Sequence, residues 1–165
     1  MSVYDIVQHL EMLDQLHFKL IELGKQKKQI IIDNNIEELT KIMNQESMLL
    51  KQITEIDSKR VKTVETTVKQ KGMQPNPNLT ITQLTRFIID PEEQKALEAA
   101  QNKLLKTMDE MNHVNKLNQQ LIEQSLSYIN VTLETVLGTA DDNVTYQNPL
   151  KNQHGSRKGI FDVKG

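Results

Sequence analysis

Two pairs of a carboxylate and a histidine have the residue types and the spacing that could bind a metal ion. Asp14 stands three residues before His17, and Glu110 stands three residues before His113. In four-helix di-metal bundles this spacing directs both groups into the core, where further buried carboxylates complete an iron or manganese site. Here leucine and methionine residues take the core positions of both helices, so we expect the two pairs on solvated flanks. The sequence therefore predicts no metal, no cofactor and no catalysis.

Other catalytic motifs and several classes of partner are not indicated. Residues 155–159 lack the spacing and the preceding strand of a phosphate-binding loop, and no nucleophile elbow or zinc-helix motif occurs. The chain has no cysteine, which excludes disulfides and thiolate metal sites. Its net charge of -2 gives no reason to expect binding to nucleic acid. A metal-dependent bundle enzyme is a competing hypothesis, which stoichiometric iron or manganese in the purified protein would support.

A row of asparagines has a different potential use. Asn112, Asn115 and Asn118 follow one another at a spacing of three, beside an apolar stripe. The row is either a polar face at the edge of a bundle, or a set of amide donors and acceptors offered to a bound peptide or helix. Both interpretations stay open from the spacing alone.

The element that carries this row is a long helix predicted over residues 91–137. Asp90 is suited to cap it, Pro91 to occupy its first position, and Gly138 to end it. Such a helix is on the order of 70 Å long. The apolar residues that recur along one of its faces are Leu97, Leu104, Met108, Met111, Val114, Leu117, Leu121, Leu126, Ile129, Leu133 and Val136.

The upstream sequence predicts helices over residues 3–32, 36–70 and 81–89, with Asn35 suited to cap the second and Thr80 the third. A short turn at residues 33–35 favours an antiparallel hairpin of the first two. Gly24 weakens the first helix by about 1 kcal/mol relative to alanine, and β-branched residues at 61–68 favour fraying of the second.

The chain is thus expected to be all-α. We predict an elongated antiparallel helical bundle or coiled coil over residues 1–140, with two long N-terminal helices, a short third helix and a very long last one. Residues 141–165 are expected to form a flexible tail. With 37% hydrophobic and 4% aromatic residues, the composition suits such a bundle. The first residues lack a signal-peptide pattern, and the longest aliphatic run is too short to span a bilayer, so we expect a cytoplasmic protein without stable membrane insertion.

Three segments of the chain resemble a known family. The first is the predicted hairpin, with its leucines at 10–23, the Asp33-Asn34-Asn35 turn and Leu49-Leu50. The second runs from Asn115 to Leu126, and the third is the tail, with a tyrosine followed by a glycine- and lysine-rich run that ends at residues 160–164. Together they are similar to the FlgN-like flagellar export chaperones.

This resemblance implies a cytoplasmic chaperone of the flagellar type III export system. Such proteins bind hook-associated proteins of the hook–filament junction (FlgK or FlgL type), prevent premature association of their terminal helices and deliver them to the export gate. Tyr146 matches the tail tyrosine implicated in docking to the gate, although Gln147 stands where related tails often have glycine. The family's partner-binding region corresponds here to Asn115, Leu117, Asn118, Leu121, Ile122, Ser125, Leu126 and Ile129.

The apolar stripe of the predicted helix over residues 91–137 also favours binding of a partner helix. A long amphipathic helix that is covered along only part of its length exposes an apolar groove, to which an amphipathic partner helix can bind. The alternative is a structural or adaptor coiled-coil protein that self-associates through the same stripe. A homodimer is compatible with either interpretation, because a second copy can cover an unoccupied groove.

Overall fold

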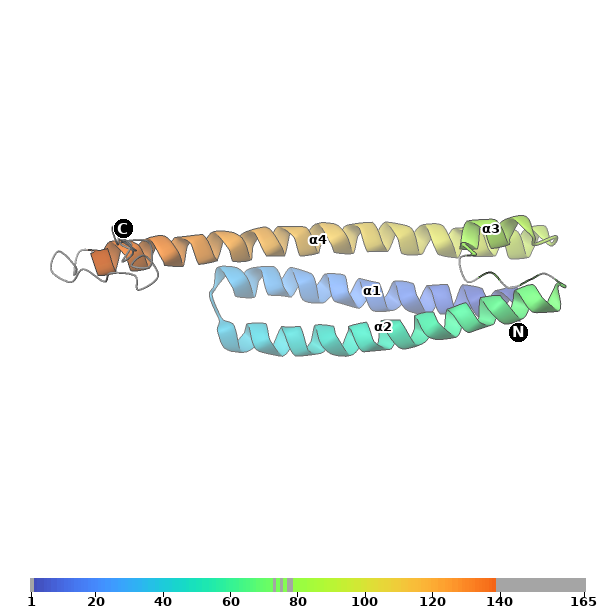
Figure 1. Cartoon of the computed structure of the whole chain (residues 1–165), viewed down its shortest axis with the longest axis horizontal. Helices are drawn as coiled ribbons and strands as arrows, with labels where there is room; N and C mark the ends of the chain where they lie inside the picture. The colour runs from blue at the N-terminus through green and yellow to red at the C-terminus, as the bar shows by residue number, and fades with distance from the viewer. Residues whose placement is uncertain (1, 73, 75, 77–78, 139–165) are drawn as a thin grey trace, which may run out of the picture. The chain divides into compact units, whose positions relative to one another are not determined.

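The computed structural model describes residues 2–72, 74, 76 and 79–138, and all regular structure in this part of the chain is helical (Figure 1). The helices are α1 (Val3–Ile32), α2 (Ile36–Gln70), α3 (Ile81–Arg86) and α4 (Pro91–Gly138). The predicted all-α class is confirmed. The chain divides into two compact units, Met1–Gln124 and Ser125–Gly165, and α4 contributes to both. The predicted tail at residues 141–165, with Tyr146, lies outside the described residues.

The helices α2, α3 and α4 each follow a polar residue whose side chain accepts a hydrogen bond from a backbone amide of the first turn. Asn35 accepts from the amide of Glu38 at 3.1 Å, at the start of α2. Thr80 and Gln83 bond each other's backbone amides at the start of α3. These caps lie where the sequence predicted them, because a capping residue acts through its immediate neighbours.

The third helix is shorter than predicted, because it ends at Arg86 and not at residue 89. The amide of Phe87 donates to the carbonyl of Leu84 at 2.9 Å, which closes the helix with a tight three-residue turn. Residues that precede a proline avoid the helical region, and Pro91 begins α4 immediately downstream. The chain therefore leaves α3 early enough to start the next helix.

Within the first unit, α1 and α2 form the predicted antiparallel hairpin, and α4 runs parallel to α1 (Figure 1). Two hydrogen bonds fix the register of the parallel pair. Thr107 bonds Asp14 across 93 positions, and Asn118 bonds Gly24 across 94 positions. Because these offsets are nearly equal, the two helices advance together in the same direction.

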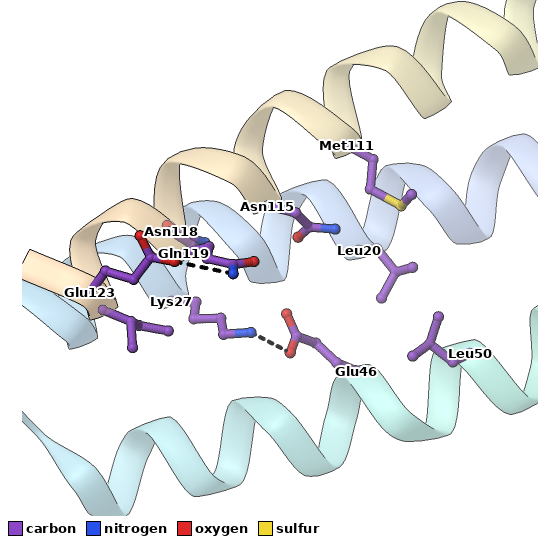
Figure 2. Close-up of a pocket in the computed structure, with 10 residues that line it drawn as sticks. Leu20, Lys27, Glu46, Leu50, Met111, Asn115, Asn118, Gln119 and Glu123 are labelled. Carbon is purple, nitrogen blue, oxygen red and sulfur yellow. Dashed lines mark hydrogen bonds and ion pairs between the residues drawn. The ribbon is translucent and has the colours of Figure 1, made fainter. Parts of the chain in front are cut away.

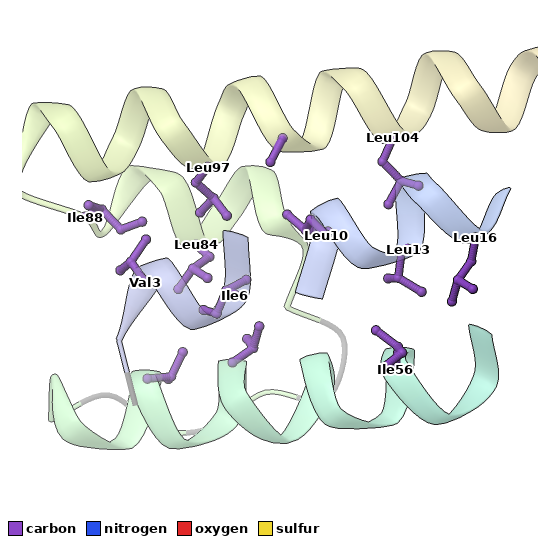
Figure 3. Packing of buried hydrophobic residues seen from close by; sticks show 13 residues of the cluster. Val3, Ile6, Leu10, Leu13, Leu16, Ile56, Leu84, Ile88, Leu97 and Leu104 are labelled. Carbon is purple, nitrogen blue, oxygen red and sulfur yellow. The ribbon is translucent and has the colours of Figure 1, made fainter. Parts of the chain in front are cut away.

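The hydrophobic core of the first unit lies where all four helices meet (Figure 3). On α3, Leu84 is fully buried against the beginning of α1, so the short helix completes a four-helix bundle there. Burial of each large aliphatic side chain contributes about 1.5–3 kcal/mol relative to exposure. The buried members of this cluster are Val3, Ile6, Leu10, Leu13, Leu16, Ile56, Val64, Val68, Leu84, Ile88, Leu97, Ala100 and Leu104.

Candidate partner-binding groove

The candidate site is a groove in the first unit, with α1 as its floor and with α2 and α4 as its walls (Figure 2). Ile6, Leu13 and Leu20 follow one another on α1 at heptad spacing and therefore lie on one face. Ile6 and Leu13 belong to the core cluster that contains Leu84 of α3, and Leu13 and Leu20 also line the groove. We call this open strip the α2–α4 groove.

The α2–α4 groove consists of two successive cavities. The cavity next to the start of α3 measures about 470 Å³ and the following one about 450 Å³. The first is lined by Leu10, Leu13, His17, Ile53, Asp57, Arg60, Leu79, Thr80, Ile81, Gln101, Leu104, Leu105 and Met108. The second is lined by Leu20, Lys27, Glu46, Leu50, Met111, Asn115, Asn118, Gln119, Ile122 and Glu123.

An ion pair joins α1 to α2 inside the second cavity. Lys27 Nζ lies 2.9 Å from Glu46 Oε2, and the two side chains are only 18% and 17% exposed (Figure 2). Lys27 continues the heptad of Leu13 and Leu20, and Glu46 lies between Leu39 and Ile53 in the matching heptad of α2. This pair was not predicted from the sequence. The signal that could have found it is the presence of opposite charges at two otherwise apolar heptad positions.

The other charged side chains of the groove also have partners. Arg60 donates through Nε to Asp57 Oδ1 at 2.8 Å in the first cavity. In the second cavity Gln119 donates to Glu123 at 3.3 Å. The groove therefore combines apolar surface with two internal ion pairs, and the exposed carboxylate of Glu123 has only the neutral amide of Gln119 beside it among the described residues.

A close contact between α1 and α4 lies at the wall of the second cavity. Asn118 is 3% exposed and donates through Nδ2 to the carbonyl of Gly24 at 2.7 Å. Its other amide atom, Oδ1, is buried and has no hydrogen-bond partner among the described residues. A buried polar atom without a protein partner is uncommon in folded proteins, and an ordered water or a donor of a bound molecule can satisfy it.

The residues predicted to bind a partner are distributed over both units. Asn115, Asn118 and Ile122 line the groove of the first unit, but the Asn118 amide nitrogen is engaged within the chain. Two further predicted residues of this unit do not line the groove, Leu117, which is exposed, and Leu121, which is half-buried. The predicted set contains none of the residues that line the first cavity, and in the second cavity it lacks Leu20, Lys27, Glu46, Leu50, Met111, Gln119 and Glu123.

In the second unit, α4 carries an exposed apolar face. Leu126 is 55% exposed and Ile129 is 42% exposed, whereas the predicted Ser125 is half-buried. Leu133 and Val136, which are also exposed, continue the same spacing of three and four residues. These four apolar residues, Leu126, Ile129, Leu133 and Val136, form what we call the C-terminal apolar face.

One of the two expected solvated pairs is buried. Asp14 is 5% exposed and His17 is 8% exposed, because α4 packs over this side of α1. Asp14 accepts from Thr107 Oγ1 at 2.5 Å and pairs with Lys103 Nζ at 3.0 Å. Nδ1 of His17 lies 2.7 Å from the carbonyl oxygen of Leu13, which can only accept, so the ring nitrogen donates.

These contacts use the Asp14 oxygens that a metal ion would need. Among the residues that the structure describes, no group of three or more histidine, cysteine or acidic side chains could hold a metal. Over the same residues, none of the helices combines the length and the apolar character needed to cross a membrane.

Comparisons with known proteins identify a family. The family model described as "FlgN protein" matches residues 1–154. A relative from Bacillus subtilis (strain 168), named "Uncharacterized protein YvyG", is 25% identical to this chain in an alignment of 166 residues that covers 99% of each protein. No solved structure matches the chain significantly. The family match extends over nearly the whole sequence, and the chain belongs to the FlgN protein family.

Proposed function

We propose that this chain is a cytoplasmic chaperone of flagellar export that binds the terminal helices of hook-associated proteins, prevents their premature association and delivers them to the export gate. Membership of the FlgN family supports a chaperone role in flagellum biogenesis in general terms. The observation that carries the finer proposal is the C-terminal apolar face. Leu126, Ile129, Leu133 and Val136 leave a continuous nonpolar strip on α4 exposed.

Capture by this face needs no catalysis. An amphipathic helix that lies against it removes apolar surface of both partners from water, at about 25 cal/mol for each Å² buried. The terminal helices of the partner would otherwise associate with each other through the same kind of surface. A chaperone that covers them competes directly with that association, and release at the gate frees them again.

The test compares two faces of the same helix. In the double variant that carries both Leu126→Asp and Ile129→Asp, we expect at least tenfold weaker binding of a purified FlgK-type hook-associated protein, measured by calorimetry. The matched control is Tyr128→Asp with Val131→Asp, because both residues are exposed and lie on the opposite side of α4. Both variants should keep the helical circular dichroism of the original chain. Equal loss of binding in the two variants would contradict the proposal.

A structural or adaptor coiled coil is the second candidate, because the same exposed face could bind another copy of the chain. Light scattering over a range of protein concentrations separates the two functions. If the chain is a chaperone, we expect any homodimer to dissociate when a FlgK- or FlgL-type protein is added. A dimer that this partner neither dissociates nor binds would favour the adaptor function.

For delivery to the gate, the family resemblance implies that Tyr146 docks to the export gate. Tyr146→Ala should therefore impair export without weakening partner binding.

A further inference from the structure

The α2–α4 groove occupies the position of a fourth helix that the chain itself fills only at one end. In the core, α3 packs Leu84 against the first turns of α1. Leu79 and Ile81, at the beginning of α3, then border the open groove. The exposed apolar surface of the groove lies on its walls, at Leu50, Leu105 and Ile122. Its floor continues on α1 from Leu13 to Lys27, where Leu13 and Leu20 are buried. This stretch has a length of about 20 Å, which corresponds to a helix of about 14 residues.

The charges of the groove restrict what can bind there. Lys27 is paired with Glu46, and Arg60 is paired with Asp57. A charged side chain on the inner face of a bound helix would lose its hydration without finding an uncompensated counter-charge. Beside these two pairs, an uncharged inner face is therefore complementary to the groove, whereas Glu123 lies at an exposed position with only the neutral Gln119 as partner among the described residues.

Asn118 offers a hydrogen-bond acceptor to a bound helix. Because its Nδ2 is engaged with Gly24, its buried Oδ1 is left as an acceptor without a partner among the described residues. A neutral donor on the bound helix, such as the hydroxyl of serine or threonine or the amide of asparagine or glutamine, can satisfy it. Leu50 on α2 and Ile122 on α4 provide exposed apolar contacts in the same cavity.

We propose that the α2–α4 groove binds a second helical segment of the exported partner, and that the inner face of this segment is aliphatic, uncharged and equipped with one amide or hydroxyl donor opposite Asn118. This inference rests on the proposed function, since the segment belongs to the protein that the C-terminal apolar face binds. The partner is thus held by two surfaces of the chaperone. Binding at the groove depends on shape and apolar burial rather than on ion pairing, so it is insensitive to salt.

Site-specific labelling tests the occupancy of the groove in the full chain. The chain has no cysteine, so a single introduced cysteine can carry an environment-sensitive fluorophore without background. Leu50→Cys places the label in the groove, and Met48→Cys is the matched control on the outer side of the hairpin, beside Phe18 and Leu23. Both positions are exposed and lie on α2. On addition of a FlgK-type protein, we expect a blue shift from the label at position 50 and none from the label at position 48.

A second measurement tests the uncharged inner face. Leu50→Glu should weaken binding of the FlgK-type protein at least tenfold, whereas Met48→Glu should change it less than twofold. Raising sodium chloride from 0.1 to 0.5 M should change the affinity of the original chain less than twofold. A strong salt dependence, or equal effects of the two variants, would overturn the proposal.

The outcomes distinguish this inference from the proposed function. If the partner binds but the label at position 50 does not respond, the groove is not its site and the proposed function stands. If the partner does not bind the original chain, both proposals fail. A label at position 50 that is already shielded in the free protein would also overturn the inference. Shielding that rises with protein concentration would identify a second copy as the occupant, and shielding independent of concentration would identify the chain's own C-terminal segment.

Discussion

The side-chain amide of Asn118 on α4 donates to the backbone carbonyl of Gly24 on α1 at 2.7 Å. This contact is short because α1 has no side chain at that position. A Cβ atom added to Gly24 would lie 2.7 Å from Cγ1 of Val114, which is closer than real Cβ contacts. The glycine therefore permits α1 and α4 to approach, and the asparagine fixes their register.

Gly24→Ala should destabilise the protein, although helix propensity alone predicts a stabilisation of about 1 kcal/mol. The added methyl group collides with Val114 unless the two helices move apart, and overpacking of this kind costs about 1–3 kcal/mol. We expect a net decrease of the free energy of unfolding, measured by urea denaturation of the full chain followed by circular dichroism.

Two further variants control this prediction. Val114→Ala removes the group that collides, so the double variant with Gly24→Ala should recover most of the stability lost by Gly24→Ala alone. Gly138→Ala, at the last residue of α4, provides a control for the added methyl group, because an added Cβ there meets no atom within 4 Å. A stabilising effect of Gly24→Ala would show that the helices can separate at no cost.

Asn118→Asp should destabilise the protein at neutral pH by about 2–4 kcal/mol. The substitution replaces the donor to the Gly24 carbonyl with a carboxylate, which is buried and can only accept. Protonation restores a donor, so the lost stability should return as the pH is lowered toward 4. Denaturation at pH 7 and pH 4 measures the difference. Asn115→Asp is the control, because Asn115 is exposed and lines the open groove, and it should change stability by less than about 0.5 kcal/mol.

The sequence predicted the first two helices and the caps of α2 and α3 because these features depend on neighbouring residues. It did not predict that α1 and α4 run parallel, since this depends on contacts such as that between Gly24 and Asn118, 94 positions apart. From the sequence, Gly24 has only the local cost of a glycine in a helix. The close approach of α4 to Gly24 is a tertiary contact, which the neighbouring residues in the sequence do not indicate.

The same limit applies to residues whose local preferences are outweighed by packing. The β-branched residues of α2 predicted fraying, yet the helix continues to Gln70. Thr63 and Thr67 are buried there, and each hydroxyl donates to a carbonyl one turn earlier. Burial against the rest of the core compensates for the lower helix propensity. For the candidate groove, the sequence predicted three of its lining residues on α4, but not the walls formed by α1 and α2.

Chelation of metal ions should leave the stability of the protein unchanged, whereas removal of the Thr107 hydroxyl should lower it. Asp14 is engaged by Thr107 and Lys103, so we expect no shift of the melting temperature with EDTA and no stoichiometric metal in the purified protein. Thr107→Val removes the hydrogen bond to the buried carboxylate and should cost about 1–3 kcal/mol. Thr135→Val, an exposed substitution at the other end of α4, is the control and should have little effect. A melting temperature that falls on chelation would contradict this account of Asp14.

The start of α1 should loosen at acidic pH. The backbone amide of Ser2 donates to Oδ2 of Asp5 at 2.6 Å, and this hydrogen bond holds the pKa of Asp5 below its ordinary value of 3.8. Because the pKa is depressed in the folded chain, the carboxylate contributes stability above the unfolded value, and this contribution is lost as the pH falls through the folded value. The effect is local, since Asp5 lies at the surface.

Nuclear magnetic resonance can follow this transition at single residues. The side-chain carboxyl of Asp5 should titrate with a midpoint below 3.8, and exchange of the Ser2 amide should accelerate over the same pH range. In Asp5→Asn the cap no longer depends on a carboxylate, so the exchange of Ser2 should lose this pH dependence. The buried Val3 and Ile6 stand immediately beside the cap, so loosening should begin there and not in the middle of α1. An Asp5 midpoint at or above 3.8 would show that the hydrogen bond does not persist in solution.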